Sequence, residues 1–476
     1  MGRIVAEPAA EGKNSAWIAL GIAIATAALL AIGTGAGSLI NGDEATYALF
    51  ARGLRQGDYL HLRLGDTIMH QRPPLYPWLL ALSTGLLGET AFALRLPSVL
   101  AGGAAAAFTC LLGERLWGRR AGIVAGLLFA TLALAYLYGR AVVSDMTLTA
   151  FVVASIYLAA TRRWLGAGLA LGAALLVKQV VGLLPLVAPV ALAWGREGPR
   201  RRDVLVLAAA AALIWAPWHV AMTVLDGRAF WAGYLGTNVL RRAGESLIAP
   251  TGPGYYLEIL WRHEGPLVLL AAAGLAFAAA RAWRRRAGDA LVLLWLVGVV
   301  GAFTLASSRI EYYLLPAYPA LALAMVRPLA LLRPALAAAA GAALVAASAV
   351  AHLPQRIGDT DRSPEIRALA GAAAPDVVVD DLPMAPELYG GRRVTTVVTR
   401  LPNYVRVLQQ AFLDPTRVVW IPPEALPAFL LARPGAVVLE PKAQLRHPLP
   451  PGARVVGETA RYVLYRIRSP GDSVAR

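Results

Sequence analysis

The segment RRWLGAGLALGAALLVKQVVGLLPLVAPVALAWGREGPRRR (162–202) decides the fold class of this chain. Two apolar runs, 164–177 and 180–194, lie between clusters of arginine, and Lys178 stands between the runs. A helix of about 20 apolar residues spans the roughly 30 Å hydrocarbon core of a bilayer, and short loops rich in Lys and Arg stay in the cytoplasm. The segment therefore predicts two short membrane helices whose shared turn, at Lys178, lies on the non-cytoplasmic side.

The rest of the chain repeats this pattern of apolar runs and arginine clusters. Hydrophobic residues make up 58% and charged residues 16% of the 476 positions, which excludes a single water-soluble core. A formal charge of +16 would suggest nucleic acid as a partner of a soluble protein, but short arginine clusters between apolar runs indicate topology instead. We expect no nucleic-acid partner and about eleven spanning helices, over 16–36, 91–113, 121–138, 141–160, 164–177, 180–194, 203–223, 266–280, 290–306, 311–327 and 334–351.

The positive-inside rule orients these helices. The first run, 16–36, is too long for a signal-peptide core, so we expect it to remain as the first span with a cytoplasmic N-terminus. Every predicted inside loop is then basic, with Arg115, Arg119 and Arg120; Arg162 and Arg163; Arg196, Arg200, Arg201 and Arg202; Arg281, Arg284, Arg285 and Arg286; and Arg327 and Arg333. The outside loops are 37–90, 139–142, 178–179, 224–265 and 307–310, followed by the tail.

The tail after residue 352 has a different composition. Short β-branched runs at 377–381, 393–398, 417–421 and 436–440 alternate with helical patterns at 364–373, 402–413 and 423–432. This alternation predicts a small α/β domain over 352–476, outside the cytoplasm, beside a transmembrane domain over 1–351. In the outer loop, we interpret the apolar stretch 74–88 as an interfacial helix, because a span there would reverse the charge pattern. Cys110 is the only cysteine, so no intrachain disulfide forms.

Two adjacent acids follow the first span. Asp43 and Glu44 begin the amphipathic stretch NGDEATYALFARGLRQGDYL (41–60) at the expected membrane boundary. One interpretation is structural, since an acid at a helix N-terminus satisfies free N–H groups and favours the helix dipole. The other is functional: a general base or a cation ligand that faces a cavity.

Two further charged residues lie at the outer boundary. Arg72 precedes Pro73 and Pro74, which fix the backbone, and a rigid cation at a membrane surface suits a phosphate, although pairing with lipid headgroups is the alternative. Asp145 lies in the outer part of a predicted span, which is costly unless it faces a partner or a water-filled cavity. An ion pair with Arg140 is the structural alternative for Asp145.

Lys178 is a lysine in a chain whose basic residues are almost all arginines. Of the 45 Lys and Arg residues, only Lys13, Lys178 and Lys442 are lysines. Either chance placed a lysine there, or the site needs the compact ammonium of lysine in place of the planar guanidinium of arginine. Together with Arg72 and the outer-loop residues Arg241 and Arg309, Lys178 completes a cationic set around acids, which fits an anionic lipid-linked substrate. Arg242 and Glu311 lie beside members of this set.

This arrangement resembles the GT-C type membrane glycosyltransferases that use polyprenyl-phosphate sugars. The resemblance is strongest to the protein O-mannosyltransferases and to the aminoarabinose transferases of lipid A, and it covers roughly residues 15 to 330. The stretches that carry it are the acidic pair with a following tyrosine (Asp43, Glu44 and Tyr47), the basic-Pro-Pro-Leu-aromatic stretch (72–76), Asp145, Lys178 between two half-length helices, PWH (217–219), the aromatic-rich loop 230–241 and the R…YLLP segment (309–316).

The resemblance implies a donor sugar on a polyprenyl phosphate, transferred outside the cytoplasm with inversion to a lipid, glycan or protein acceptor. It implies a multi-pass protein of the bacterial inner membrane. It makes Asp43 the catalytic base, with Glu44 and Asp145 supporting it. The candidates for binding the substrate are Arg72, Tyr76, Lys178, Arg241 and Arg309. The four cations among them are also the candidates for neutralising the departing lipid phosphate. No cofactor is required by this scheme, and a divalent cation remains open.

Two departures from the family pattern bear on substrate recognition. In the aminoarabinose branch an acid commonly precedes the basic-Pro-Pro stretch, whereas this chain has Gln71, so a role that needs a carboxylate there is lost or moved. The tail is also short and contains no further apolar run of spanning length. Acceptor recognition therefore cannot be inferred from larger relatives.

Two other functional classes compete with an enzyme. A flippase or other transporter of lipid-linked sugars would also carry broken helices and intramembrane charge, but we find no inverted repeat, and the charges gather toward one face. An outward-facing scaffold for the α/β domain would leave Asp145 and Lys178 unexplained. The sequence therefore favours a glycosyltransferase.

Overall fold

A computed structural model of the chain describes residues 13–36, 39, 42–64, 67–241, 244, 252–354, 363–379, 384–391, 394–399, 418–445 and 448–468. The chain divides into two compact units. The helical unit comprises Met1–Gly35, Gln71–Leu79 and Phe92–Arg356, and the mixed unit comprises Ala36–His70, Leu80–Ala91 and Ile357–Arg476. Much of the expected outer loop 37–90 thus groups with the tail. The expected division at residue 352 lies close to the end of the helical unit.

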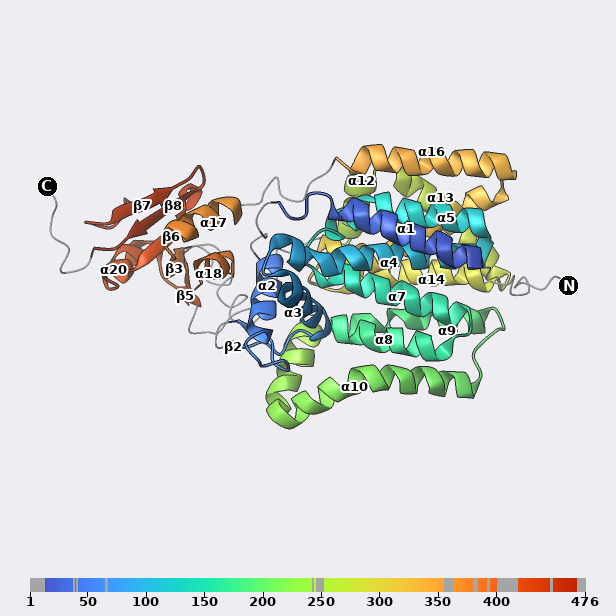
Figure 1. Cartoon of the computed structure of the whole chain (residues 1–476), viewed down its shortest axis with the longest axis horizontal. Coiled ribbons are helices and arrows are strands. Elements are labelled where there is room, and N and C mark those ends of the chain that lie inside the picture. The colour runs from blue at the N-terminus through green and yellow to red at the C-terminus, as the bar shows by residue number, and fades with distance from the viewer. Residues whose placement is uncertain are drawn as a thin grey trace. The chain divides into compact units, whose positions relative to one another are not determined.

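The helical unit consists of helices that lie side by side along one direction (Figure 1). Its α-helices are α1 (Lys13–Ala31), α4 (Ala91–Trp117), α5 (Arg119–Thr131), α6 (Ala133–Tyr138), α7 (Ser144–Ala160), α8 (Trp164–Lys178), α9 (Val187–Trp194), α10 (Arg201–Trp231), α12 (Tyr255–Glu264), α13 (Leu267–Trp283), α14 (Ala287–Leu305), α15 (Tyr318–Val326) and α16 (Pro334–His352). Its tighter or wider helical turns are η1 (Gln179–Leu186), η2 (Ala232–Arg241), η3 (Glu311–Ala317) and η4 (Arg327–Leu331), and α3 (Leu75–Leu87) begins in this unit.

Each of the eleven stretches expected to span the membrane is mostly helical. Among the described residues, seven helical segments are long and apolar enough to cross a membrane: Asn14–Ala31, Ala91–Trp117, Trp164–Trp194, Arg201–Thr237, Ala287–Leu305, Glu311–Leu331 and Pro334–His352. Leu75–Leu87, Ser144–Ala160 and Leu267–Trp283 are shorter apolar helices. The fold class of a polytopic helical membrane protein is confirmed, and the count of eleven spans stays a prediction.

The segment Trp164–Trp194 is folded in two. A Cβ on Gly182 would lie 2.5 Å from the backbone nitrogen of Leu175, so η1 runs back against the end of α8. At the other end of the hairpin, the Arg162 guanidinium donates to the Glu197 carbonyl at 2.5 Å. The expected pair of short helices with a turn at Lys178 is therefore present. Close helix approach depends on small residues, and Gly168 and Gly172 bring α8 against the α10 backbone.

The arginine-rich loops meet at one end of the helical unit. Trp194 Nε1 donates to the Ala282 carbonyl at 2.8 Å, which joins the 195–202 loop to the 281–286 loop. Arg327 pairs with Asp289 at 2.6 Å, and its guanidinium lies 4.9 Å from the centre of the Trp117 ring. Together with the Arg162–Glu197 hydrogen bond, these contacts connect all five expected inside loops. We call this the arginine end, and Lys178 lies at the opposite end of the α8 hairpin.

The mixed unit contains a six-stranded sheet. Its strands are β3 (Val377–Val379), β4 (Thr395–Val398), β5 (Val418–Trp420), β6 (Val437–Pro441), β7 (Arg454–Glu458) and β8 (Tyr462–Arg466), in the order β5-β4-β3-β6-β8-β7. Strands β5, β4, β3 and β6 are parallel, whereas β8 pairs antiparallel with both β6 and β7. Its other elements are α2 (Asp43–Leu54), a two-stranded ribbon of β1 (Arg63–Leu64) and β2 (Thr67–Ile68), α17 (Ser363–Ala372), α18 (Met384–Gly390), η6 (Pro423–Ala425), α20 (Leu426–Leu431) and η7 (Lys442–Gln444).

The small α/β domain expected in the tail is confirmed. All four predicted strands and the helices near 364–373 and 423–432 are present, and the sheet packs its valines and Tyr465 against Leu426 and Leu430 of α20. The predicted helix at 402–413 lies outside the described residues. Sequence reasoning missed α18, β7 and β8, whose stretches lack a long β-branched run or a clear helical period.

Candidate active site

Asp145 and Lys178 form a buried ion pair. Asp145 lies in the first turn of α7 and is 2% exposed, while Lys178 is the last residue of α8. The Lys178 ammonium donates to Asp145 Oδ1 at 2.6 Å. Arg140, the alternative partner considered for Asp145, instead donates to the Tyr136 hydroxyl and the Ile32 carbonyl. The carboxylate thus compensates the charge of an ammonium at the end opposite the arginine end.

Two tyrosines of η3 cover this ammonium. The Lys178 nitrogen lies 4.1 Å from the centre of the Tyr313 ring and 5.9 Å from that of Tyr312. Cation–π contacts stabilise a partly desolvated ammonium. The bond to Asp145 uses one of three N–H donors, and the Lys178 side chain remains 20% exposed. The ammonium is therefore fixed in position while part of its surface stays open.

The residue before these tyrosines belongs to a second polar cluster. Glu311 accepts a hydrogen bond from the Tyr138 hydroxyl, and its other oxygen lies 3.3 Å from His263 Nε2. The Tyr138 and Tyr312 rings also pack edge to face, with centroids 5.2 Å apart. These contacts join α6, α12 and η3, and they hold the tyrosine pair that faces Lys178.

Gln179 fixes the turn that presents Lys178. Its backbone has φ 35° and ψ −133°, a conformation that favours glycine. Its side chain is buried, and its amide nitrogen donates to the Gln71 carbonyl at 2.9 Å and the Tyr234 carbonyl at 3.0 Å. The residue therefore ties together the stretch before Arg72, the turn after Lys178 and η2.

We expect Gln179→Gly to be more stable than Gln179→Ala. Both variants lose the two side-chain hydrogen bonds, worth about 0.5–1.5 kcal/mol each, but only glycine relieves the backbone strain of about 1–3 kcal/mol. Thermal unfolding of the two variants in detergent measures the difference. Equal unfolding temperatures would contradict the assigned strain.

The Arg72 stretch connects to the same region through its neighbours. Arg72 is half-buried, and the preceding carbonyl, of Gln71, accepts the Gln179 bond. Tyr76 is fully buried, and its hydroxyl lies 2.9 Å from Ser98 Oγ, which in turn donates to the Val143 carbonyl at 3.3 Å. Here Tyr76 holds the start of α3 against α4, close in sequence to the turn before Asp145. A contact of Tyr76 with substrate stays a prediction.

The PWH stretch belongs to an aromatic cluster of α10 and η2. His219 Nε2 lies 2.8 Å from the Tyr234 hydroxyl, and His219 Nδ1 lies 2.9 Å from the Trp215 carbonyl. Trp218, Phe230 and Tyr234 pack around His219 with ring centroids 4.9 to 6.0 Å away. Because Tyr234 also accepts the Gln179 bond through its carbonyl, this cluster positions the aromatic loop beside the Lys178 turn.

Of the two outer-loop arginines Arg309 and Arg241, the structure describes the side-chain contacts of Arg309 only. Arg309 donates through Nε and Nη2 to the Thr304 carbonyl at 3.1 and 2.7 Å, two residues before the η3 segment that covers Lys178. Arg241 ends η2, and its side chain lies outside the described part of the chain, as does Arg242. Their proposed contacts with a phosphate stay predictions.

Asp43 and Glu44 lie in the mixed unit, in the first turn of α2. The N-cap is Gly42, and no side chain forms a cap hydrogen bond, so the capping interpretation does not describe these acids, although their charges still favour the helix dipole. Glu44 is buried and Asp43 is half-buried. Their roles as base and support stay predictions.

A third acid in the loop after α2 is already engaged. Asp58 lies 3.0 Å from His61 Nδ1 and accepts from Arg63 Nε at 3.1 Å. Burial opposes ionisation, but the hydrogen bonds from His61 and Arg63 outweigh it and lower the pKa of Asp58 to about 2. Such a weak base is unsuited to accept a proton near neutral pH, so Asp58 does not compete with Asp43 for that role.

No group of three His, Cys, Asp or Glu side chains that could hold a metal ion occurs among the residues that the structure describes. The ammonium and arginines near Lys178 are suited to bind an anion directly.

Comparison with known proteins finds similarity over part of the chain. The model of the dolichyl-phosphate-mannose-protein mannosyltransferases matches residues 71–220, the region that contains Arg72, Asp145 and Lys178. An undecaprenyl phosphate-alpha-4-amino-4-deoxy-L-arabinose arabinosyl transferase of Erwinia tasmaniensis is 30% identical over 59% of this chain and 54% of its own length. The enzyme of the same name from Pectobacterium carotovorum is 29% identical over 62% of this chain and 55% of its own length.

Over these regions the chain is similar to glycosyltransferases whose names specify a polyprenyl-phosphate-type sugar donor. The chain spans about half the length of these two relatives. Its described part contains seven helical segments that are long and apolar enough to cross a membrane.

Two solved structures of low sequence identity share the fold of this chain. ArnT from Cupriavidus metallidurans bound to undecaprenyl phosphate has a TM-score of 0.73 at 17% identity, over 96% of this chain and 98% of that chain. The oligosaccharyltransferase of Archaeoglobus fulgidus in its apo form has a TM-score of 0.52 at 14% identity, over 79% of this chain and 64% of that chain. The first match includes both the helical part and the tail of this chain.

Sequence reasoning missed part of this candidate site. Gln179, Tyr312 and Tyr313 lie next to residues that were singled out, but nothing in their residue types distinguished them. The RIEYY stretch (309–313) was noted for Arg309 and Glu311, and its two tyrosines could have been suspected, since aromatic rings often accompany an ammonium. His263 and Tyr138 gave no sequence signal.

Proposed function

We propose that this protein transfers a sugar from a polyprenyl-phosphate donor to an acceptor outside the cytoplasm, with inversion at the anomeric carbon. The observation that carries the proposal is the Lys178 ammonium, held by Asp145 at 2.6 Å under two tyrosine rings at the end opposite the arginine end. The names of the relatives, which are arabinosyl transferases that use an undecaprenyl phosphate sugar, support the donor class.

The chemistry follows from charge. As the sugar leaves, negative charge grows on the lipid phosphate, and a fixed cation stabilises that charge in a low-dielectric site. Lys178 is suited to this role because Asp145 and the tyrosines hold it without using all of its donors. Arg72, Arg241 and Arg309 are the further candidates for the same phosphate.

The acceptor decides whether a base is needed. A hydroxyl acceptor loses a proton during attack, and Asp43, supported by Glu44, is our candidate to accept it. A phosphate acceptor already carries its nucleophilic oxygen as an anion and needs no strong base. The acceptor is a lipid, a glycan or a protein component outside the cytoplasm.

We infer the orientation from the arginine end. Its five basic loops fit the cytoplasmic side, so the Lys178 turn and the tail would lie outside, with the N-terminus in the cytoplasm. Protease protection of the tail in spheroplasts compared with inverted vesicles measures this directly.

Turnover by the purified protein tests the function. In detergent with an undecaprenyl-phosphate pentose and a membrane-lipid extract, we expect release of free undecaprenyl phosphate together with a pentosylated product, both visible by mass spectrometry. A transporter would instead move the intact donor between leaflets of a vesicle. Donor movement without any cleavage would overturn the transferase assignment.

A further inference from the structure

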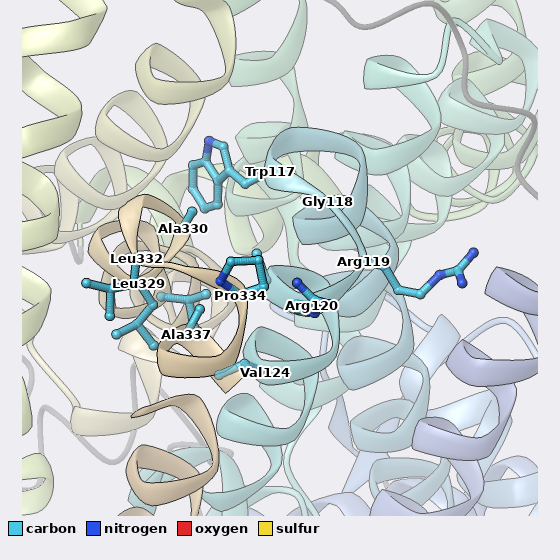
Figure 2. A pocket seen from close by; sticks show the side chains of 12 residues that line it. Trp117, Gly118, Arg119, Arg120, Val124, Leu329, Ala330, Leu332, Pro334 and Ala337 are labelled. Atoms are coloured by element: carbon cyan, nitrogen blue, oxygen red, sulfur yellow. The ribbon is translucent and has the colours of Figure 1, made fainter. Parts of the chain in front are cut away.

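A pocket opens at the arginine end, far along the helices from the Lys178 turn. It has a volume of about 480 Å³ and lies between the α4–α5 turn and the η4–α16 turn (Figure 2). Binding pockets for small ligands span about 300–1,000 Å³. Its lining residues are Trp117, Gly118, Arg119, Arg120, Ala121, Val124, Val326, Leu329, Ala330, Leu332, Pro334 and Ala337. The pocket therefore has room for a ligand.

The walls of the pocket are apolar. Figure 2 shows Leu329, Leu332 and Ala337 along one side and the Trp117 ring above them. The guanidinium of Arg327 lies 4.9 Å from the centre of the Trp117 ring and is held there by Asp289, which also pairs with Arg281. Beside the pocket, Leu331 and Leu336 are 60% and 58% exposed, which suits contact with hydrocarbon.

The mouth of the pocket is cationic. Arg119 and Arg120 are both exposed, and none of the residues that line the pocket is acidic. Arg119 extends away from the pocket in Figure 2, and it lies 3.6 Å from the Glu114 carboxylate. Within the part of the chain that the structure describes, no acidic side chain pairs with Arg120. The first turns of α5 and α16 also border the pocket, and their dipoles add to the positive potential.

We propose that this pocket binds an anionic glycerophospholipid of the adjacent leaflet, with the phosphate beside Arg120 and the first part of an acyl chain against Trp117 and Leu332. A free phosphate ion would leave the apolar walls exposed to water. A zwitterionic lipid would bring an ammonium that finds no carboxylate in the lining. The combination of cationic mouth, apolar wall and interfacial tryptophan matches a lipid with a net negative headgroup.

Native mass spectrometry of the full chain in detergent tests this site. Phosphatidylglycerol is titrated against the wild type, Arg120→Gln and Ala337→Phe, with phosphatidylethanolamine as the zwitterionic comparison. One basic residue near a membrane surface contributes about 1 kcal/mol, so we expect Arg120→Gln to weaken binding of the first phosphatidylglycerol about five-fold. The phenylalanine would fill the pocket and prevent that binding.

The matched control is Arg202→Gln. Arg202 is exposed in the first turn of α10, in another basic loop of the same end, and it does not line the pocket. We expect this variant to bind like the wild type. Equal losses in Arg120→Gln and Arg202→Gln, equal binding of the two lipids, or displacement of phosphatidylglycerol by millimolar inorganic phosphate would each overturn the proposal. If Ala337→Phe fails to fold, the two arginine variants still decide the question.

Discussion

The double variant Lys178→Met/Asp145→Asn is expected to keep the fold and to lose about 10²–10³-fold in turnover. Removing one fixed donor from a developing anion costs this much in comparable enzymes. The variant replaces the ion pair by two neutral side chains of similar size, and such replacement of a buried pair is often neutral for stability. It therefore separates the function of the ammonium from its contribution to folding.

The single variants provide the contrast. Lys178→Met takes away the ammonium partner of a carboxylate that is 2% exposed, which costs about 3–5 kcal/mol for a buried pair. We expect a lower unfolding temperature for Lys178→Met than for the double variant, and low turnover in both. Lys178→Arg keeps the positive charge but places a larger, planar guanidinium under the two tyrosines. We therefore expect its turnover to be intermediate between the wild type and Lys178→Met.

Release of undecaprenyl phosphate in a single turnover, measured beside the thermal unfolding of each variant, checks these expectations. Wild-type turnover in the stable double variant would remove Lys178 from the phosphate-binding role. The proposed transferase function would survive that result, because release by the wild type is measured in the same assay.

Asp43→Asn is expected to reduce turnover by about 10²–10⁴-fold with a hydroxyl acceptor, the usual contribution of a general base. The asparagine has the same shape and cannot accept the proton. With an acceptor whose nucleophile is a phosphate oxygen, the same variant should keep most of its activity, since no proton has to be removed. Turnover with the two acceptor classes thus reports what the acceptor is as well as what Asp43 does.

A matched control for Asp43→Asn is Glu458→Gln, which neutralises another acid of the mixed unit. Glu458 is an exposed residue of β7 that pairs with Lys442 on the surface, and such pairs contribute little to stability. We expect its turnover to equal that of the wild type. Equal turnover of Asp43→Asn and wild type with a hydroxyl acceptor would exclude Asp43 as the base.

Much of this architecture follows from the sequence because the signals are local. A run such as 164–177 must be helical in a membrane, where each backbone group needs a partner within its own segment, and clusters such as Arg200 to Arg202 stay at one face because charges are costly in hydrocarbon. In the tail, the β-branched runs 377–381 and 436–440 became β3 and β6 for an equally local reason. The helical bundle, its arginine end and the α/β tail were predictable on these grounds.

The site depended on contacts that no local pattern encodes. Asp145 and Lys178 are 33 residues apart and meet only because α8 packs along α7. From the sequence, Arg140 was the structural alternative as a partner for the acid. Gln179 adopts a backbone conformation that suits glycine because its side chain bonds the carbonyls of Gln71 and Tyr234, which lie 108 and 55 positions away. Hydrophobic periodicity and charge clustering determine which segments cross the membrane. Only tertiary packing decides which buried polar group satisfies another, because that choice is made by distance in space.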